Sequence, residues 1–333
     1  MHVDRAHSPS SHTLYEGETL KRTTLYVGSL TLILSAWEPT LMAGDWGRVQ
    51  KDFHTSSEMK PGGRLEIENQ NGSVEVIGWD RPTLDVSATK YASNEDQLNA
   101  IKIVVVADDK GAGALIKTEF PDRSWGFGGN YGVKYVIHVP RKTKLDSAQT
   151  TNGSVTVEDL EGGGHAKSTN GHLQITRVTG DYLLETTNGS ISIEDAKGYE
   201  RAATTNGAIN GRLAAGSFQA QTTNGSIDLT VSRPDQGRPI RASTTNSSIN
   251  IALAEFHDNA ITAETTHGSL VLRLPQTLNA RVNAETSLSG ISNDLPLSTT
   301  DESSKTHLRG QWGKGGAPIS ATTSMGSIHF ERY

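Results

Sequence analysis

The sequence predicts an all-β protein, a parallel β-solenoid with coils of about 18 residues preceded by a β-rich N-terminal cap. Three observations support this prediction. Aromatic residues make up 6 % of the 333 residues and glycines number 34, which suits short strands and tight turns better than helices. A motif of the form Thr-Thr-Asn-Gly-Ser-Ile recurs along the second half of the chain, and aliphatic residues recur at fixed positions after each copy. A fixed period is typical of solenoids, in which each repeat forms one coil.

The turn of each copy defines the period. Its first residue recurs at intervals of 18 residues, at Asn152, Asn170, Asn188, Asn206 and Asn224. Less regular copies follow at Asn246, His267, Ser289 and Met325, and an isolated earlier copy lies at Asn71. Because coils of equal length place equivalent residues above one another, the asparagines from Asn152 to Asn246 are predicted to form a structural ladder of side-chain hydrogen bonds.

Two aliphatic columns follow each turn. Three residues after the asparagine or its substitute lie Val155, Leu173, Ile191, Ile209, Ile227, Ile249, Leu270 and Ile328. A second column lies two residues further on and is interrupted by Gly211. This alternation predicts a strand with one buried face. A second strand is predicted on the far side of each coil, where Ala166, Leu184, Ala202 and Ala220 lie fourteen residues after the asparagine.

The Asn-Gly pair is interpreted as a sharp corner of the coil. Asparagine tolerates the left-handed backbone conformation and glycine adopts it without steric cost, so we expect that conformation at the corner. The alternative is a hairpin turn between antiparallel strands, as in a β-sandwich. The strict period, and the aliphatic residues on only one side of each turn, favour the solenoid.

Residues 1–43 are predicted to be an export signal that is cleaved from the mature chain. Lys21 and Arg22 stand directly before an apolar stretch from Leu25 to Trp37, which has the length of a signal-peptide core and is short for a bilayer span. The alternatives are a buried strand and a retained membrane anchor. No integral membrane span is expected in the mature chain, which we expect to be periplasmic, at the cell surface or secreted.

Residues 44–148 lack the period and are interpreted as the β-rich cap, followed by the solenoid at 149–333. A short helix is predicted at residues 93–101, where Ser93 precedes Asp96 in a capping arrangement. Toward the C-terminus, residues 232–240, 254–260 and 297–318 are predicted to be loops. The final coil, residues 319–333, is expected to close the stack.

Charge and cysteine content exclude several classes of function. The formal net charge of −6 includes no basic run, so nucleic acid is not an expected partner. Cysteine is absent, which excludes disulfides, thiolate metal sites, cysteine nucleophiles and a lipidated cysteine.

Four stretches together resemble a known family. They are "GGRLEIENQNGSVEVIGWD", "YVIHVPRKTKLDSAQTTNGSVTVEDLEGG", the run of Asn-Gly-Ser/Ala-Ile copies, and the closing "GGAPISATTSMGSI". The chain, over roughly residues 60–333, is similar to the bacterial "putative adhesin" family, a β-strand-repeat domain of unknown function found in exported and envelope-associated proteins. This resemblance implies a β-solenoid at the cell envelope and supplies no catalytic residues.

The polar residues of the repeat do not point to an active site. Carboxylates six and seven residues after the asparagine alternate with Thr176 and Arg177, which indicates a solvated face with alternating charge. His165 and His172 fit no zinc-ligand spacing and are interpreted as surface residues. No catalytic residue, metal site or cofactor is therefore expected.

Residues 123–135 are the most distinctive stretch outside the repeat. Trp125, Phe127 and Tyr131 lie in a glycine-rich setting and are candidates for stacking on sugars or anchoring a partner. The alternative is that they pack onto the cap.

The sequence thus favours a non-enzymatic, exported β-solenoid that acts in adhesion or scaffolding, with envelope glycans or surface proteins as partners. The alternative function is that of a carbohydrate-active β-helix enzyme, either a lyase or a hydrolase.

Overall fold

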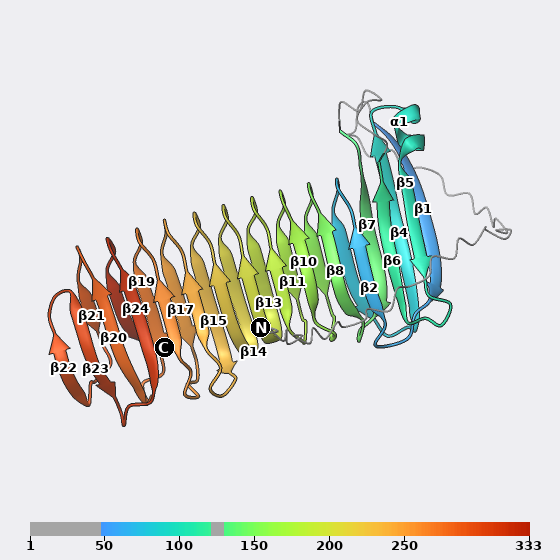
Figure 1. The fold of residues 1–333 in the computed structure, drawn as a ribbon. Coiled ribbons are helices and arrows are strands. Elements are labelled where there is room, and N and C mark those ends of the chain that lie inside the picture. Colours follow the sequence, from blue (N-terminus) through green and yellow to red (C-terminus); the bar gives the residue numbers. More distant parts are fainter. Residues whose placement is uncertain (1–47, 121–129) are drawn as a thin grey trace, which may run out of the picture. The chain divides into compact units, whose positions relative to one another are not determined.

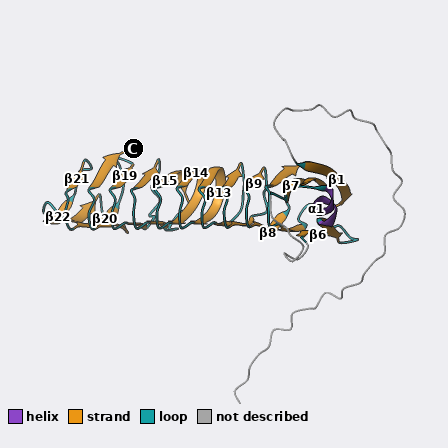
Figure 2. Cartoon of the chain, turned by 90° about the horizontal axis from the view of Figure 1, so that it is seen from above, coloured by secondary structure: helices purple, strands orange, loops and turns teal. Residues whose placement is uncertain are grey.

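Strands dominate the fold. The computed structural model describes residues 48–120 and 130–333, which form 25 strands and one short helix (Figure 1). The strands pair into two ladders, ladder A and ladder B, and β13 and β14 run through both. Figure 2 shows the ladders as two layers, with β7, β9, β15 and β19 in one and β6, β8, β20 and β22 in the other.

Ladder A runs through thirteen strands, each paired with the next. In that order they are β1 (Val49–Glu58), β4 (Thr83–Ala92), β7 (Gly132–Pro140), β3 (Val74–Trp79), β9 (Val155–Glu158), β11 (Leu173–Thr176), the first parts of β13 (Ile191–Ala203) and β14 (Ile209–Gln221), β15 (Ile227–Pro234), β17 (Ile249–Leu253), β19 (Leu270–Leu274), β25 (Ile328–Arg332) and β21 (Ile291–Asn293). All of the pairings that do not involve β4 are parallel.

In ladder B, too, each strand is paired with the next. It contains β5 (Lys102–Ala107), β6 (Gly113–Glu119), β2 (Arg64–Glu68), β8 (Lys144–Thr150), β10 (Gly164–Ser168), β12 (Tyr182–Glu185), the second parts of β13 and β14, β16 (Ile240–Ser243), β18 (Ile261–Glu264), β24 (Ala317–Thr323), β20 (Ala280–Thr286), β23 (His307–Trp312) and β22 (Thr299–Ser303). The antiparallel pairings are those that involve β5 or β23.

Each coil contributes one strand to each ladder, so the predicted parallel β-solenoid is confirmed. Residues one period apart are direct partners: Ile191 pairs with Leu173 on one side and with Ile209 on the other. The antiparallel hairpin alternative is wrong for the repeat, because every strand pairing between consecutive repeats is parallel.

The aliphatic columns form the core between the two ladders. Every residue of the first predicted column is fully buried, with 0 % exposure from Val155 to Ile328. Gly211 interrupts the second column because the ring of Phe218 fills the space inside it: a Cβ built on Gly211 would lie 2.6 Å from that ring. The missing aliphatic side chain at Gly211 is therefore replaced by the ring of Phe218, which lies on the same strand, β14. We call this replacement the packing exchange.

The left-handed conformation expected at the Asn-Gly corner is wrong for the regular repeats. Positive φ angles in the described chain include Gly72, in the first copy, but none of the regular corner asparagines or glycines. The glycine is needed for a different reason, which is the close approach of successive backbones. A Cβ on Gly171 would lie 1.8 Å from the carbonyl oxygen of Gly153 in the coil beneath, so no side chain fits there.

A buried threonine hydroxyl at the end of each coil bonds to the corner at which that coil begins. Thr186 is 7 % exposed and its Oγ1 donates to the carbonyl oxygen of Gly171 at 3.0 Å. Thr204 and Thr222 make the same bond to Gly189 and Gly207. The buried column of the Thr-Thr pairs thus satisfies backbone carbonyls that a tight corner leaves free.

At both ends of the stack, the order in which the coils lie in space differs from their order along the chain. The coil β2–β3 lies between coils β6–β7 and β8–β9. The coil β24–β25, which ends the chain, lies between β18–β19 and β20–β21. The expectation that residues 319–333 close the stack is therefore wrong, because β21 and the hairpin β22–β23, inside the predicted loop at 297–318, form its end.

The N-terminal segment contributes whole coils as well as end strands. Strands β2, β3, β6 and β7 continue the two ladders. The boundary predicted between the cap and the solenoid, after residue 148, lies inside β8. The antiparallel strands β1, β4 and β5 lie at this end of the ladders. The predicted helix is present as α1 (Glu95–Ala100), but Asn94 rather than Ser93 caps it, accepting from the Gln97 N–H at 2.9 Å. The predicted export signal lies outside the described residues.

Candidate functional site

The asparagines of the repeat lie along one edge of the stack and are joined to one another. The Nδ2 atom of each donates to the Oδ1 atom of the asparagine one coil before it, at 2.7 or 2.8 Å, through Asn71, Asn152, Asn170, Asn188, Asn206, Asn224 and Asn246. Each internal asparagine therefore donates one bond and accepts another. These side chains are exposed but already engaged, which makes the asparagine edge a reinforcement of the stack.

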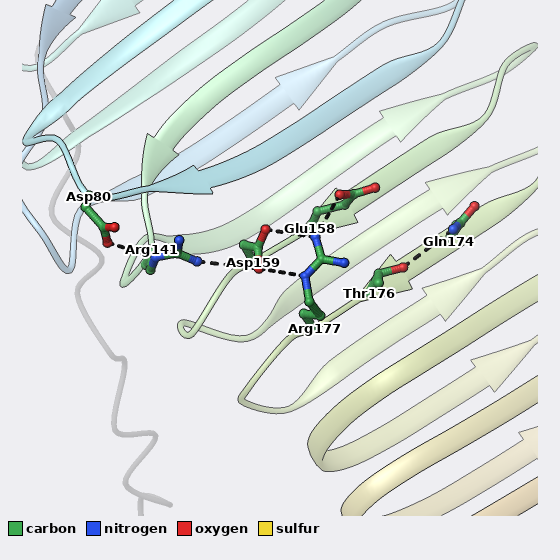
Figure 3. Close-up of polar contacts among 7 residues, drawn as sticks. All are labelled: Asp80, Arg141, Glu158, Asp159, Gln174, Thr176 and Arg177. Atoms are coloured by element: carbon green, nitrogen blue, oxygen red, sulfur yellow. Dashed lines mark hydrogen bonds and ion pairs between the residues drawn. The ribbon is translucent and has the colours of Figure 1, made fainter.

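Charged residues form a second network at the opposite corner (Figure 3). Arg177 contacts Asp159 at 2.9 Å and Glu158 at 3.1 Å. Arg141 contacts Asp80 at 2.8 Å and Asp159 at 3.5 Å. The hydrogen bond from Arg177, aided by its charge and that of Arg141, lowers the pKa of Asp159. The carboxylates six and seven residues after the asparagine are thus held in ion pairs here.

This network lies where the chain order of the coils changes. After β7 the chain crosses at Arg141 to β8, passing the coil β2–β3, and after β3 it leaves at Asp80 toward β4. The backbone carbonyl of Arg141 accepts from the Glu161 N–H at 2.7 Å. Asp80 and Arg141 therefore join two crossovers that the regular repeat lacks.

A polar groove of about 350 Å³ lies on ladder A, and we call it the ladder A groove. Its outward residues are Ser192, Glu194, Asn210, Arg212, Asp228, Thr230, Asn250, Ala252 and Arg273. Asn250 donates to Asp228, and Arg273 pairs with Glu331 at 2.9 Å. Since equivalent residues of neighbouring strands are ~4.8 Å apart, the groove offers evenly spaced hydrogen-bonding groups along the stack.

A second hollow of about 350 Å³ surrounds Trp79 at the crossover corner, and we call it the Trp79 pocket. It is lined by Pro61, Trp79, Asp80, Arg81, Pro82, Pro140, Arg141, Lys142 and Glu161. The Trp79 ring stacks on His138 with centroids 5.0 Å apart, and its Nε1 donates to the Thr83 carbonyl at 2.9 Å. This hollow combines an aromatic ring, prolines and cations.

The candidate aromatic cluster of the sequence is only partly described. Trp125 and Phe127 lie outside the described residues. Tyr131 is half-buried and its ring lies 5.2 Å from that of Phe120, tilted by 58°. Tyr131 therefore packs beside the end of β6, and its role in ligand contact stays a prediction.

The two repeat histidines lie apart and have different partners. His165 Nε2 lies 3.1 Å from Glu185 Oε2 on ladder B, and His172 Nδ1 lies 2.8 Å from Ser190 Oγ near the asparagine edge. Within residues 48–120 and 130–333, no three His, Cys, Asp or Glu side chains are grouped so that they could hold a metal ion. Over the same residues, no helix has the length and apolar character needed to cross a membrane.

One carboxyl group lies inside the core. Glu200, on β13, is fully buried between Tyr182 and Phe218 in ladder B, and neither of its oxygens makes a hydrogen bond. Burial, with a contribution from the charge of Asp181, raises the pKa of Glu200 to about 9. The group is therefore neutral at pH 7.

The fold and these surfaces define a class of protein: a parallel β-solenoid whose edges are reinforced by side-chain amide bonds and ion pairs, with one polar groove on ladder A and one pocket of mixed character around Trp79. Residues 62–331 match the model of the Toastrack DUF4097 family, a domain of unknown function, and the chain belongs to this family. This agrees with the adhesin-family resemblance of the sequence.

Several solved structures are similar to this chain, including the following two. One is a putative cell adhesion protein from Clostridium sporogenes, with 10 % identity, a TM-score of 0.22, and coverage of 85 % of this chain and 100 % of the other. The other is a putative adhesin from Bacteroides fragilis, with 15 % identity, a TM-score of 0.36, and coverage of 84 % and 97 %. No curated protein matches the chain.

The Trp79 pocket was missed by sequence reasoning. A signal was present, because Trp79 ends an alternating strand and is followed directly by Asp80, Arg81 and Pro82. The sequence does not show that Arg141 lies beside Asp80, because the two residues are 61 positions apart along the chain.

Proposed function

We propose that the protein is an exported, non-enzymatic β-solenoid that acts in adhesion or scaffolding at the cell envelope, with glycans or surface proteins as partners. The observation that supports this best is the outer face of ladder A. Its polar side chains Gln174, Ser192, Asn210, Asp228 and Asn250 stand on five successive strands in register. A rigid row of this kind suits many weak contacts with an extended partner.

Export is proposed from the apolar segment at residues 25–37, which follows Lys21 and Arg22. Cell fractionation and N-terminal sequencing of the mature protein test this part. We expect the protein outside the cytoplasm, with a mature chain that lacks the export signal at residues 1–43. An intact N-terminus in the cytoplasmic fraction would contradict export.

Binding without turnover is the test of the adhesion role. The purified protein is incubated with envelope polysaccharides and surface proteins, and both retention and newly released reducing ends are measured. We expect saturable retention with no release of reducing ends. Release that continues with time would favour a carbohydrate-active enzyme instead.

A matched pair of variants makes that test specific to ladder A. Asn210→Lys with Asp228→Lys places two long cations in the ladder A groove. As the control, Gln219→Lys with Thr262→Lys places two lysines on the outer face of ladder B, on either side of Arg241. We expect the first pair to weaken retention of an extended partner more than the second.

A further inference from the structure

The Trp79 pocket is built rigidly around a half-buried indole. The ring is held by its stack on His138, by its hydrogen bond to the Thr83 carbonyl, and by the Arg81 guanidinium 5.0 Å from the ring centroid. Pro61, Pro82 and Pro140 add apolar walls that lose little conformational entropy on binding. The pocket therefore presents a preorganised apolar surface to a small rigid group.

The cations of the pocket differ in how they are engaged. Arg141 is committed to Asp80 and Asp159. Arg81 and Lys142 are exposed and form no ion pair with any residue of the described chain. Glu161 lines the same pocket, so its acidic side chain offsets the charge of only one of these two cations. In a chain with a net charge of −6, this corner keeps a local positive excess.

This combination indicates the chemistry of a ligand. A saccharide ring has apolar C–H faces that pack on an indole and on prolines, and hydroxyl groups that donate to a carboxylate such as that of Glu161. Arg81 and Lys142, which form no ion pair in the described chain, favour a sugar that carries an acidic group, because a neutral sugar leaves one positive charge of the pocket uncompensated. We infer that the Trp79 pocket binds acidic sugar residues of a polysaccharide.

The position of the pocket supports the same inference. It lies where two crossovers leave the regular coils, and its walls come from four separate turns, after β1, β3, β7 and β9. Turns that leave a rigid scaffold are common places for binding residues, because their side chains are free of the repeat pattern. The inference rests on the proposed adhesion function and assigns a ligand class to a surface distinct from the ladder A groove.

Trp79 supplies a direct reporter of binding. Of the two tryptophans in the described chain, Trp312 is 1 % exposed and Trp79 is half-buried. The full-length protein is titrated with polygalacturonate, with dextran sulfate and with neutral dextran while tryptophan fluorescence and retention on the immobilised polymer are recorded. Polygalacturonate and dextran sulfate distinguish carboxylate from sulfate as the acidic group.

Two matched pairs of substitutions make the test specific. Arg81→Ala with Lys142→Ala removes the two cations of the pocket that form no ion pair in the described chain. Arg233→Ala with Arg241→Ala removes two exposed arginines of β15 and β16 that also have no ion-pair partner in the described chain. We expect the first pair to lower affinity for at least one acidic polymer about tenfold and the second to leave it within about twofold. Trp79→Phe should remove most of the fluorescence change.

The outcomes separate this inference from the proposed function. Equal affinity of the two double variants, or equal binding of dextran and the acidic polymers, overturns the acidic-sugar site even if adhesion persists. Binding of no polysaccharide, with retention on surface proteins, also overturns it and leaves the adhesion role intact. Loss of affinity in the pocket variant alone, reduced further by added salt, supports it.

Discussion

The ring of Phe218 occupies the interior space beside Gly211, on the same strand, so the two residues together replace one aliphatic side chain of the repeat. Gly211→Val restores the repeat pattern but forces the new side chain against the ring, because even a Cβ lies 2.6 Å from it and 3.1 Å from Leu229. We expect a loss of about 3 kcal/mol in the free energy of unfolding. Denaturant unfolding measures it.

A compensating variant tests whether the ring is the cause. Adding Phe218→Leu to Gly211→Val frees interior space and should recover part of the lost stability. If the second substitution makes the protein less stable by its full separate cost, the two sites are independent and the packing exchange is disproved.

The asparagine ladder predicts a position-dependent cost. Asn188 donates one side-chain hydrogen bond and accepts another, whereas Asn246, at the end of the ladder, only donates one. With about 1 kcal/mol for each bond, Asn188→Ala should lose about twice as much stability as Asn246→Ala. Thermal and urea unfolding of the two variants provide the comparison, and equal losses would show that the ladder bonds contribute little.

The corner glycines predict a steep steric penalty. A Cβ on Gly189 would lie 2.0 Å from the Gly171 carbonyl oxygen, so Gly189→Ala must push two coils apart. We expect a loss of at least about 3 kcal/mol, seen as a large drop in Tm. Gly290→Ala is the matched control, because its nearest atom is 3.8 Å away and its φ is not positive. Similar drops for both would contradict the stacking argument.

The buried carboxyl of Glu200 predicts that stability falls as pH rises. Its pKa is raised from 4.5 to about 9 in the folded protein, so the unfolded chain releases this proton at lower pH than the folded chain. The contribution is fully present below about pH 4.5 and is lost as pH rises toward about 9, and the loss reaches about 3 kcal/mol by pH 7.

Glu200→Gln should remove this slope, so the variant becomes more stable than the parent above about pH 6. Urea unfolding from pH 5 to pH 9 follows the difference. Glu264→Gln, an exposed residue of ladder B, is the control and should leave the slope unchanged. A parallel pH dependence of the parent and Glu200→Gln would rule out an ionisation of this kind.

The regular coils could be predicted because their information is local and periodic. The columns that begin at Val155 and Ala166 define strand, face and register in each repeat, and a shift by one residue would expose the whole column. The order of the coils at the ends could not be predicted. Asn71 carries the same motif as Asn152, but the two are 81 residues apart, and nothing in the sequence indicates that they lie in adjacent coils.

The glycine of the corner shows a different limit. Two physical reasons, a left-handed turn and a close backbone approach, both require glycine after asparagine, and one sequence cannot separate them. Only the neighbouring coil, where the Gly153 carbonyl lies beneath Gly171, decides between them. The Trp79 pocket was missed for a related reason, because its parts come from four turns that are distant along the chain.

The coil β24–β25 lies between two coils that come earlier in the chain, and this affects both synthesis and truncation. Strands β20 and β21 join the rest of the molecule mainly through these last 17 residues. A ribosome-bound chain can therefore complete its regular repeats one after another, but this end of the stack stays unfinished until residues 317–333 have left the ribosome. A stop codon before residue 317 should detach the four strands β20 to β23 as well as delete β24 and β25, so the loss of stability would exceed that of removing one repeat.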